Sequence, residues 1–185
     1  MGALWKYHPD SDKRDLILTF NSGKFNDFAV SPLNNCLVSA GFDGAIRLWD
    51  YGNRKEFYHR KFATKSQATC IDWLPFSKKN NGRMLVVGFS DGIVRFVGLE
   101  DKKFALIKAF KVHKNRITKV KCNREGNIVV AADTAGSLFF LAIDDSNLSK
   151  ITPYCLFETG FKINDLTWDR NGEKILVACQ DGKLQ

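Results

Sequence analysis

The fold is decided by the stretch Ser39-Ala-Gly-Phe-Asp-Gly-Ala-Ile-Arg-Leu-Trp-Asp50. Two apolar runs flank Asp43-Gly44. An Asp-Gly pair in this position is typical of a tight β-hairpin turn, because glycine adopts the positive φ that the turn requires. We expect the first strand to end at Phe42 and the second to end at Trp49-Asp50. A single hairpin of this kind is compatible with many folds.

The same hairpin returns along the chain at nearly constant intervals. The turn glycines are Gly2, Gly44, Gly92, Gly136 and Gly182, which are 42, 48, 44 and 46 residues apart. An aspartate precedes three of them, as Asp43, Asp91 and Asp181, whereas Ala135 precedes Gly136. Each carboxylate is expected to order its own turn by accepting hydrogen bonds from backbone amides. A period of this length indicates a repeat protein.

Short apolar segments recur in the same order within each repeat. In one unit they are 104–110, 117–122, 128–132 and 138–143. Several are almost continuously apolar, as expected for strands packed on both faces. No segment of helical length has a 3.6-residue apolar period. The chain is therefore predicted to be all-β, with four-stranded antiparallel units stacked against one another as in a β-propeller.

Composition favours a packed intracellular protein. Hydrophobic residues make up 44% of the 185 residues, and no apolar run approaches the roughly 20 residues of a membrane span. The N-terminal residues lack the apolar core of a signal peptide. The cysteines each fall in a predicted strand without CxxC spacing, which predicts buried thiols in a reducing compartment rather than disulfides or metal ligands. They are Cys36, Cys70, Cys122, Cys155 and Cys179.

On these residues the chain resembles the WD40-repeat family. Trp49-Asp50 matches its Trp-Asp signature, and Val112-His113 lies where its Gly-His dipeptide usually falls. The family period of about 40 to 45 residues and its four-stranded blade also match. The Trp49 position becomes Val97 and Leu141 in later units. The family's His–Ser/Thr–Asp–Trp hydrogen-bond network is therefore expected to be incomplete in every unit, which leaves more of the stability to apolar packing.

The resemblance also implies the extent of the fold. We expect a single partial WD40-type propeller over residues 1–185, with about four repeats. The units are expected at about 1–20 (partial), 21–62, 63–110, 111–158 and 159–185 (partial). A four-bladed ring would form if 4–7 and 16–20 paired with the final strands. The family typically has seven blades, so a fragment of a larger ring is the favoured interpretation.

Two segments, 68–75 and 82–95, further resemble ciliary WD40 proteins of the type that tethers inner-arm dynein to the axonemal doublet. This resemblance implies a non-catalytic scaffold that positions dynein or other subunits on doublet microtubules. Its implied partners are axonemal dynein or tubulin-associated subunits. Its implied location is the cytoplasm, or the axoneme of a cilium or flagellum.

No catalytic, cofactor or metal site is predicted. His8, His59 and His113 lie in different units, and none is paired with a Cys or Asp at a recognised spacing. Gly23-Lys24 lacks the upstream glycine of a phosphate-binding loop. Trp49, Trp73 and Trp168 fall in predicted strands and are expected in the core. The sequence therefore favours an interaction protein over an enzyme.

The best functional candidate is a basic segment, because the loop 111–116 enters a blade at the rim that the resembling family uses for partners. It holds Lys102, Lys103, Lys108, Lys111, Lys114, Arg116, Lys119, Lys121 and Arg124. The candidate partner-binding residues are Lys111, Lys114, Arg116, Lys119 and Lys121. The sharper hypothesis is that they bind an acidic protein surface. The simpler one is a solvated outer strand.

The net charge of +8, from 28 basic and 20 acidic residues, also permits a different function. In that alternative the chain is a WD40 scaffold in RNA processing or ribosome biogenesis that contacts RNA through a basic face. Against it, the cations are not interleaved with exposed aromatic residues suited to base stacking.

Overall fold

The computed structural model describes residues 2–20, 24–33, 35–62, 65–77, 80–144 and 146–180. Asp181 and Gly182, which were predicted to form the last turn, lie outside these residues. None of the described residues belongs to a helix with the length and hydrophobicity needed to cross a membrane.

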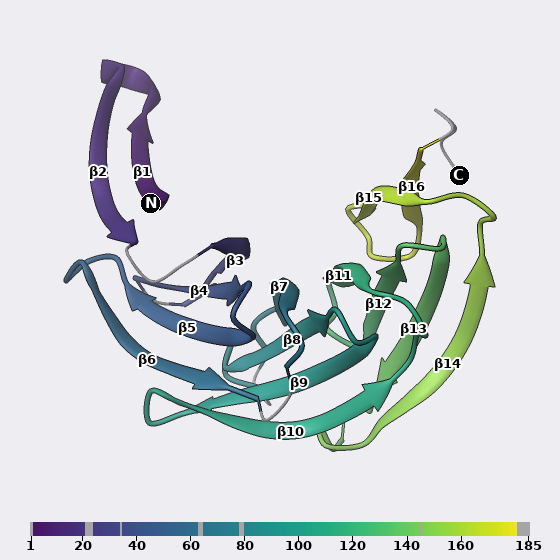
Figure 1. The fold of residues 1–185 in the computed structure, drawn as a ribbon. Coiled ribbons are helices and arrows are strands. Elements are labelled where there is room, and N and C mark those ends of the chain that lie inside the picture. The colour runs from purple at the N-terminus through teal and green to yellow at the C-terminus, as the bar shows by residue number, and fades with distance from the viewer. Residues whose placement is uncertain are drawn as a thin grey trace.

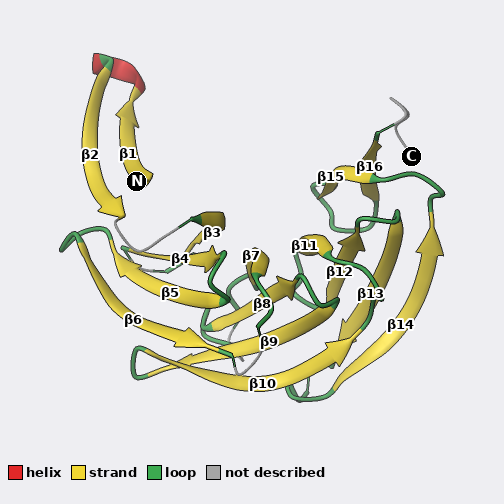
Figure 2. Ribbon diagram, in the orientation of Figure 1, coloured by secondary structure: helices red, strands yellow, loops and turns green. Residues whose placement is uncertain are grey.

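Strands dominate the described residues (Figure 2). They are β1 Gly2–His8, β2 Lys13–Phe20, β3 Phe25–Val30, β4 Cys36–Gly41, β5 Ala45–Asp50, β6 Lys55–Lys61, β7 Ala68–Trp73, β8 Met84–Phe89, β9 Ile93–Glu100, β10 Lys103–Lys111, β11 Ile117–Cys122, β12 Ile128–Asp133, β13 Ser137–Ile143, β14 Ile151–Glu158, β15 Ile163–Trp168 and β16 Ile175–Cys179. A single 3₁₀ turn, Pro9–Ser11, joins β1 to β2. The predicted all-β class is confirmed.

The strands form five antiparallel sheets in chain order. The first sheet, β1-β2, and the last, β15-β16, have two strands, whereas β3-β4-β5-β6, β7-β8-β9-β10 and β11-β12-β13-β14 each have four. Figure 1 shows the sheets fanned along an open arc, with β3, β7, β11 and β15 towards its inside and β6, β10 and β14 on its outside. This is the predicted partial propeller.

A β-bulge recurs at the same place in the three four-stranded sheets and in the β15-β16 sheet, between the innermost strand and its neighbour. The register between the first and second strands shifts between Phe25 and Asp27, and between Ala68 and Cys70. The equivalent shifts lie between Ile117 and Lys119 and between Ile163 and Asp165. Bulges increase local twist. The inner strands are thus bent alike, which gives successive sheets the same shape at the inside of the arc.

Apolar side chains fill the space between neighbouring sheets. One cluster joins the first four-stranded sheet, through residues such as Leu48, to the second, through residues such as Val97. A second cluster joins Phe96 to Leu141 of the third sheet. Leu48, Phe96, Val97 and Leu141 are all essentially inaccessible to solvent. Sheets with both faces covered explain why these strands lack apolar–polar alternation.

Side chains of the inner strands also bond from one sheet to the next. The Trp73 indole Nε1 donates to the carbonyl oxygen of Ala29, at 3.1 Å. The backbone amide of Ile71 donates to Asp27 Oδ2, at 3.0 Å, and that of Cys122 donates to Asp72 Oδ2, at 3.1 Å. Trp49 and Trp73 are buried, as predicted, while Trp168 is half-buried. The inner strands therefore fix the order and spacing of the sheets.

The cysteines all lie in strands, as predicted, and all are free thiols. The prediction that they are buried holds for Cys70 and Cys179, whereas Cys36 and Cys122 are half-buried and Cys155 is exposed on β14. It fails for Cys155 because β14 is an outer strand at an edge of its sheet, where an apolar residue need not be covered. Burial raises the pKa of the Cys70 thiol to about 12.

Candidate partner-binding surface

The tight turns within the sheets and the loops between sheets lie at the same end of the strands, on one face of the arc. We call this face the turn end. It comprises the turns 42–44, 90–92 and 134–136 and the described residues of the loops 62–67, 112–116 and 159–162. The turn glycines Gly44, Gly92 and Gly136 have φ values of 80°, 78° and 92°. Residues with a Cβ rarely adopt such values, which explains why glycine occupies these positions.

The first tight turn is held by an ion pair. Asp43 Oδ1 accepts a hydrogen bond from the amide of Ala45, at 3.1 Å. Arg47 donates to both carboxylate oxygens of Asp43, at 3.1 and 2.6 Å, and its Nε lies 3.8 Å from Glu56 Oε2. The hydrogen bonds from Arg47 lower the pKa of Asp43 to about 2. Such a bidentate pair fixes the turn geometry as well as its charge.

In the third full unit, the aspartate that orders the turn stands two residues earlier than in the other turns. Asp133 Oδ1 accepts from the amides of Ala135 and Ser137, each at 2.9 Å, and its Oδ2 lies 3.3 Å from His113 Nδ1. His113 Nε2 lies 3.0 Å from the carbonyl oxygen of Ala131. Burial lowers the pKa of His113, although Asp133 and the Ala131 carbonyl act in the opposite direction.

The sequence predicts no histidine paired with an aspartate at a recognised spacing, yet His113 lies beside Asp133, and His8 Nε2 lies 3.0 Å from Asp15 Oδ2. The His113–Asp133 pair was missed because Asp133 lies two positions before the position where the turn aspartate is expected. A rule based on fixed spacing does not detect an aspartate that fills this role from another position. The indole Nε1 of Trp49 donates to Ser39 Oγ, at 2.9 Å, in the first full sheet. The Trp–Ser and His–Asp halves of the family's network thus occur in different sheets.

Three of the predicted partner-binding residues lie at the turn end. Lys111 Nζ donates to the backbone carbonyl of Asp91. Arg116 Nη1 donates to Gln67 Oε1, at 2.8 Å, and is half-buried. Lys114 is exposed in the loop between them. These cations lie where β10 passes to β11. They therefore belong to the turn end and not to the outer side of the arc.

The other two lie elsewhere. Lys119 and Lys121 are on the inner strand β11, where Lys119 Nζ is 3.1 Å from Asp165 Oδ1 of the next sheet. Lys121 Nζ is 3.6 Å from Asp72 Oδ1 of the preceding sheet. Their charges are met by carboxylates of adjacent sheets. The five residues therefore do not form one patch, and the partner-binding prediction rests on Lys111, Lys114 and Arg116.

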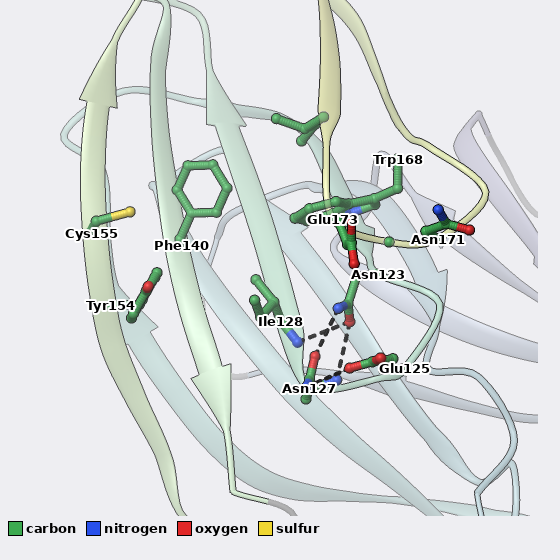
Figure 3. A pocket seen from close by; sticks show the side chains of 12 residues that line it. Asn123, Glu125, Asn127, Ile128, Phe140, Tyr154, Cys155, Trp168, Asn171 and Glu173 are labelled. Atoms are coloured by element: carbon green, nitrogen blue, oxygen red, sulfur yellow. Dashed lines mark hydrogen bonds between the residues drawn. The ribbon is translucent and has the colours of Figure 1, made fainter.

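A groove of about 520 Å³ lies away from the turn end, between the third four-stranded sheet and the β15-β16 hairpin (Figure 3). Phe140 and Trp168 form two of its walls, with ring centroids 6.5 Å apart. Its lining is Asn123, Glu125, Asn127, Ile128, Phe140, Tyr154, Cys155, Trp168, Asn171, Gly172, Glu173 and Ile175. Asn123 Oδ1 accepts from three backbone amides of the turn that follows it, including that of Ile128 at 3.0 Å.

Comparison between sheets shows what normally occupies this space. Phe140 is in register with Val130, as Phe96 is with Val86 and Leu48 with Val38. Leu48 and Phe96 are fully buried against the third strand of the following sheet, whereas Phe140 is partly exposed. In the described residues no third strand pairs with β16. The groove lies at the position where, in the first two four-stranded sheets, Leu48 and Phe96 belong to an apolar cluster shared with the next sheet.

A family comparison agrees with this architecture. The family described as WD domain, G-beta repeat matches residues 14–50. The matched segment begins in β2 and ends with β5, so one repeat joins the outer strand of one sheet to three strands of the next. These observations show that the chain contains a WD repeat of this family. The WD40 signature Trp49-Asp50 closes the matched segment.

Comparison with curated proteins extends the similarity to nearly the whole chain. It is 27% identical over 205 residues to Cilia- and flagella-associated protein 44 of Mus musculus, and 23% identical over 196 residues to the protein of that name in Trypanosoma brucei brucei. Each match covers 99% of this chain and 11% of the relative. Periodic tryptophan protein 2 of Saccharomyces cerevisiae is 21% identical over 212 residues, which cover 95% of this chain and 21% of that protein. The chain thus spans about a tenth of the length of the first two relatives.

The described sheets expose turns and loops at the turn end. Within the described ranges, no group of three or more His, Cys, Asp or Glu side chains could hold a metal ion. The buried His113–Asp133 pair bonds to backbone atoms of its own sheet. What the turn end presents to another molecule is a set of cations beside ordered turns.

Proposed function

We propose that the chain is a non-catalytic interaction scaffold of the cilium or flagellum, which positions dynein or other subunits on doublet microtubules. WD40 sheets of this kind supply protein-interaction surfaces. The observation that supports the ciliary role is that matches to Cilia- and flagella-associated protein 44 of a mammal and of a trypanosome each cover 99% of the chain. Fold alone would not distinguish this role from others, since one fold serves many functions.

The turn end is the proposed contact surface. Lys114 is exposed, and Lys111 and Arg116 flank it on the β10–β11 loop. A positive surface attracts acidic partners and raises the rate of encounter with them. A partner with an acidic surface, such as a tubulin tail or a neighbouring scaffold subunit, has the complementary charge.

Affinity purification of the tagged chain from ciliated and non-ciliated cells tests this proposal. We expect dynein or doublet-microtubule proteins to be recovered from ciliated cells only. The double variant K114E/R116E should lose them, because both charges that meet the partner are reversed. Recovery of RNA or preribosomal proteins from both cell types would overturn the ciliary role and favour the RNA-binding alternative, whose affinity should fall steeply with salt.

A further inference from the structure

Two arginines occupy equivalent positions in the first and second four-stranded sheets. Arg47 is the third residue of β5 and Arg95 the third residue of β9, each three positions after its turn glycine. Their side chains are only 8% and 6% exposed. A buried guanidinium normally has its donors met by carboxylates or carbonyl groups, because an unmet buried donor is destabilising.

The two arginines differ in what they meet. Arg47 donates two hydrogen bonds to Asp43 and has a second carboxylate, that of Glu56, at 3.8 Å. Arg95 has a single carboxylate, Asp91, and the nearest approach is 3.9 Å. Its Nη1 is buried and has no hydrogen-bond partner among the described residues.

In the first sheet, Arg47 Nη1 donates to Asp43 Oδ1 at 3.1 Å, whereas the equivalent Asp91 comes no closer than 3.9 Å to Arg95. The two sheets differ at a second position as well. Glu56, which lies 3.8 Å from Arg47 Nε, is paired in register with Trp49, and the equivalent residue of the second sheet is Leu106, paired with Val97. Arg95 therefore has neither the close aspartate nor the second carboxylate that Arg47 has.

Aromatic rings hold the Arg95 guanidinium in place. Its Cζ lies 4.2 Å from the centre of the Phe89 ring and 5.3 Å from that of Phe62. Such cation–π contacts offset part of the cost of burial but accept no hydrogen bond in the plane of the guanidinium. Burial lowers the pKa of Arg95, with Asp91 acting against the shift. The group is thus positioned while its Nη1 has no acceptor among the described residues.

The surroundings of Asp91 add positive charge. Lys111 Nζ donates to the Asp91 carbonyl oxygen, and the Asp91 amide donates to Ser66 Oγ, at 3.2 Å, beside the exposed Lys65. Arg116 donates to Gln67, whose amide donates to Ser90 Oγ next to Asp91, at 2.9 Å. Lys111 and Arg116 therefore lie near Asp91, whose carboxylate is 29% exposed and has Arg95 at 3.9 Å.

We propose that Arg95 anchors a binding site for a carboxylate side chain of an acidic peptide segment, which supplies to Nη1 the acceptor that Arg47 receives within its own sheet. The carboxylate enters beside Asp91 at the turn end, and Lys111 and Arg116 attract the neighbouring acidic residues. The site rests on the proposed function, since it names the contact through which the turn end holds an acidic partner. Arginine suits this role because its planar donors match a carboxylate.

The test is fluorescence anisotropy of a labelled hexaglutamate peptide titrated with the full chain at low salt. We expect R95Q to weaken binding by at least about tenfold, because a buried arginine–carboxylate contact is lost. The matched control R47Q should change affinity by less than about twofold, because Arg47 is already satisfied internally. A hexaglutamine peptide should not bind measurably.

A second variant keeps the proposal testable if R95Q fails to fold. L106E places a second carboxylate near Arg95, at the position equivalent to Glu56, so it should compete with the peptide carboxylate and weaken hexaglutamate binding while the fold is retained. Unchanged binding in folded R95Q or L106E would overturn the proposal, as would tighter Arg95-dependent binding of a uridine hexanucleotide. Loss of ciliary proteins in the affinity purification, with hexaglutamate binding intact, would instead refute the ciliary role and leave the site standing.

Discussion

Phe96 and Phe140 occupy equivalent positions, but only Phe96 is covered by a complete neighbouring sheet. Phe96 is fully buried and packs edge-on against Phe110, with ring centroids 6.2 Å apart. Replacement by alanine should destabilise the fold by about 3 to 5 kcal/mol, of which the aromatic pair contributes about 0.5 to 1.5 kcal/mol. Phe140 is partly exposed, so F140A should cost about 1 to 2 kcal/mol.

Urea unfolding followed by circular dichroism measures the difference. With a slope of about 2 kcal/mol per molar urea, the two midpoints should differ by about 1 M. If F96A proves too unstable, F96L should still lower the midpoint, since such swaps cost up to about 1.5 kcal/mol. Equal midpoint shifts for F96A and F140A would refute the claim that packing between complete sheets dominates stability.

Three further perturbations follow from the turn end. G92A should destabilise the fold by at least about 2 kcal/mol, because φ of Gly92 is +78° and a Cβ would lie 2.1 Å from the His113 carbonyl oxygen. The control G160A, with φ +76° and nothing within 4 Å of the added Cβ, should cost about 1 kcal/mol. Equal losses of stability in thermal unfolding would contradict this. D43N should cost on the order of 1 kcal/mol at neutral pH, a value reduced for the partial exposure of Asp43. Because the pKa of Asp43 is lowered to about 2, its contribution to stability is present above about pH 4 and is lost as the pH falls through 2. D43N should therefore reduce the dependence of the urea midpoint on pH between these values. Because the pKa of His113 is lowered by burial, its contribution is present above about pH 6.5 and declines as the pH falls below that value; H113N should remove this slope, and a wild-type midpoint that rises on acidification would show the sign to be wrong.

The regular parts of the fold could be predicted because their signals are local. The apolar runs at 84–89, 117–122 and 163–168 coincide with β8, β11 and β15. Asp-Gly marks a tight turn through the φ requirement of its glycine, which does not depend on distant residues. The repeat interval then orders the strands into sheets.

The candidate site could be predicted only in part, because it depends on contacts between sheets. Lys119 and Lys121 appeared to belong with Lys111 in one basic run, yet alternation along β11 and the position of this strand inside the arc direct them to Asp165 and Asp72. Those carboxylates lie 46 and 49 residues away in sequence. No periodicity within one unit encodes such pairs.

Arg95 was missed for a related reason. In the sequence it resembles Arg47, with an aspartate four residues earlier in both cases. The difference lies mainly in distance, since Asp43 accepts from Arg47 at 3.1 and 2.6 Å whereas Asp91 comes no closer than 3.9 Å to Arg95. Comparing equivalent positions after sheet assignment is the signal that finds such a residue.

Co-sedimentation with isolated axonemes most directly tests the proposed role of the turn end. The wild-type chain should pellet with axonemes, K114E/R116E should remain in the supernatant, and the matched reversal R83E/K103E at exposed positions of the opposite end should behave as wild type. Binding that survives the turn-end reversal, or that both reversals abolish equally, would contradict a specific contact at the turn end.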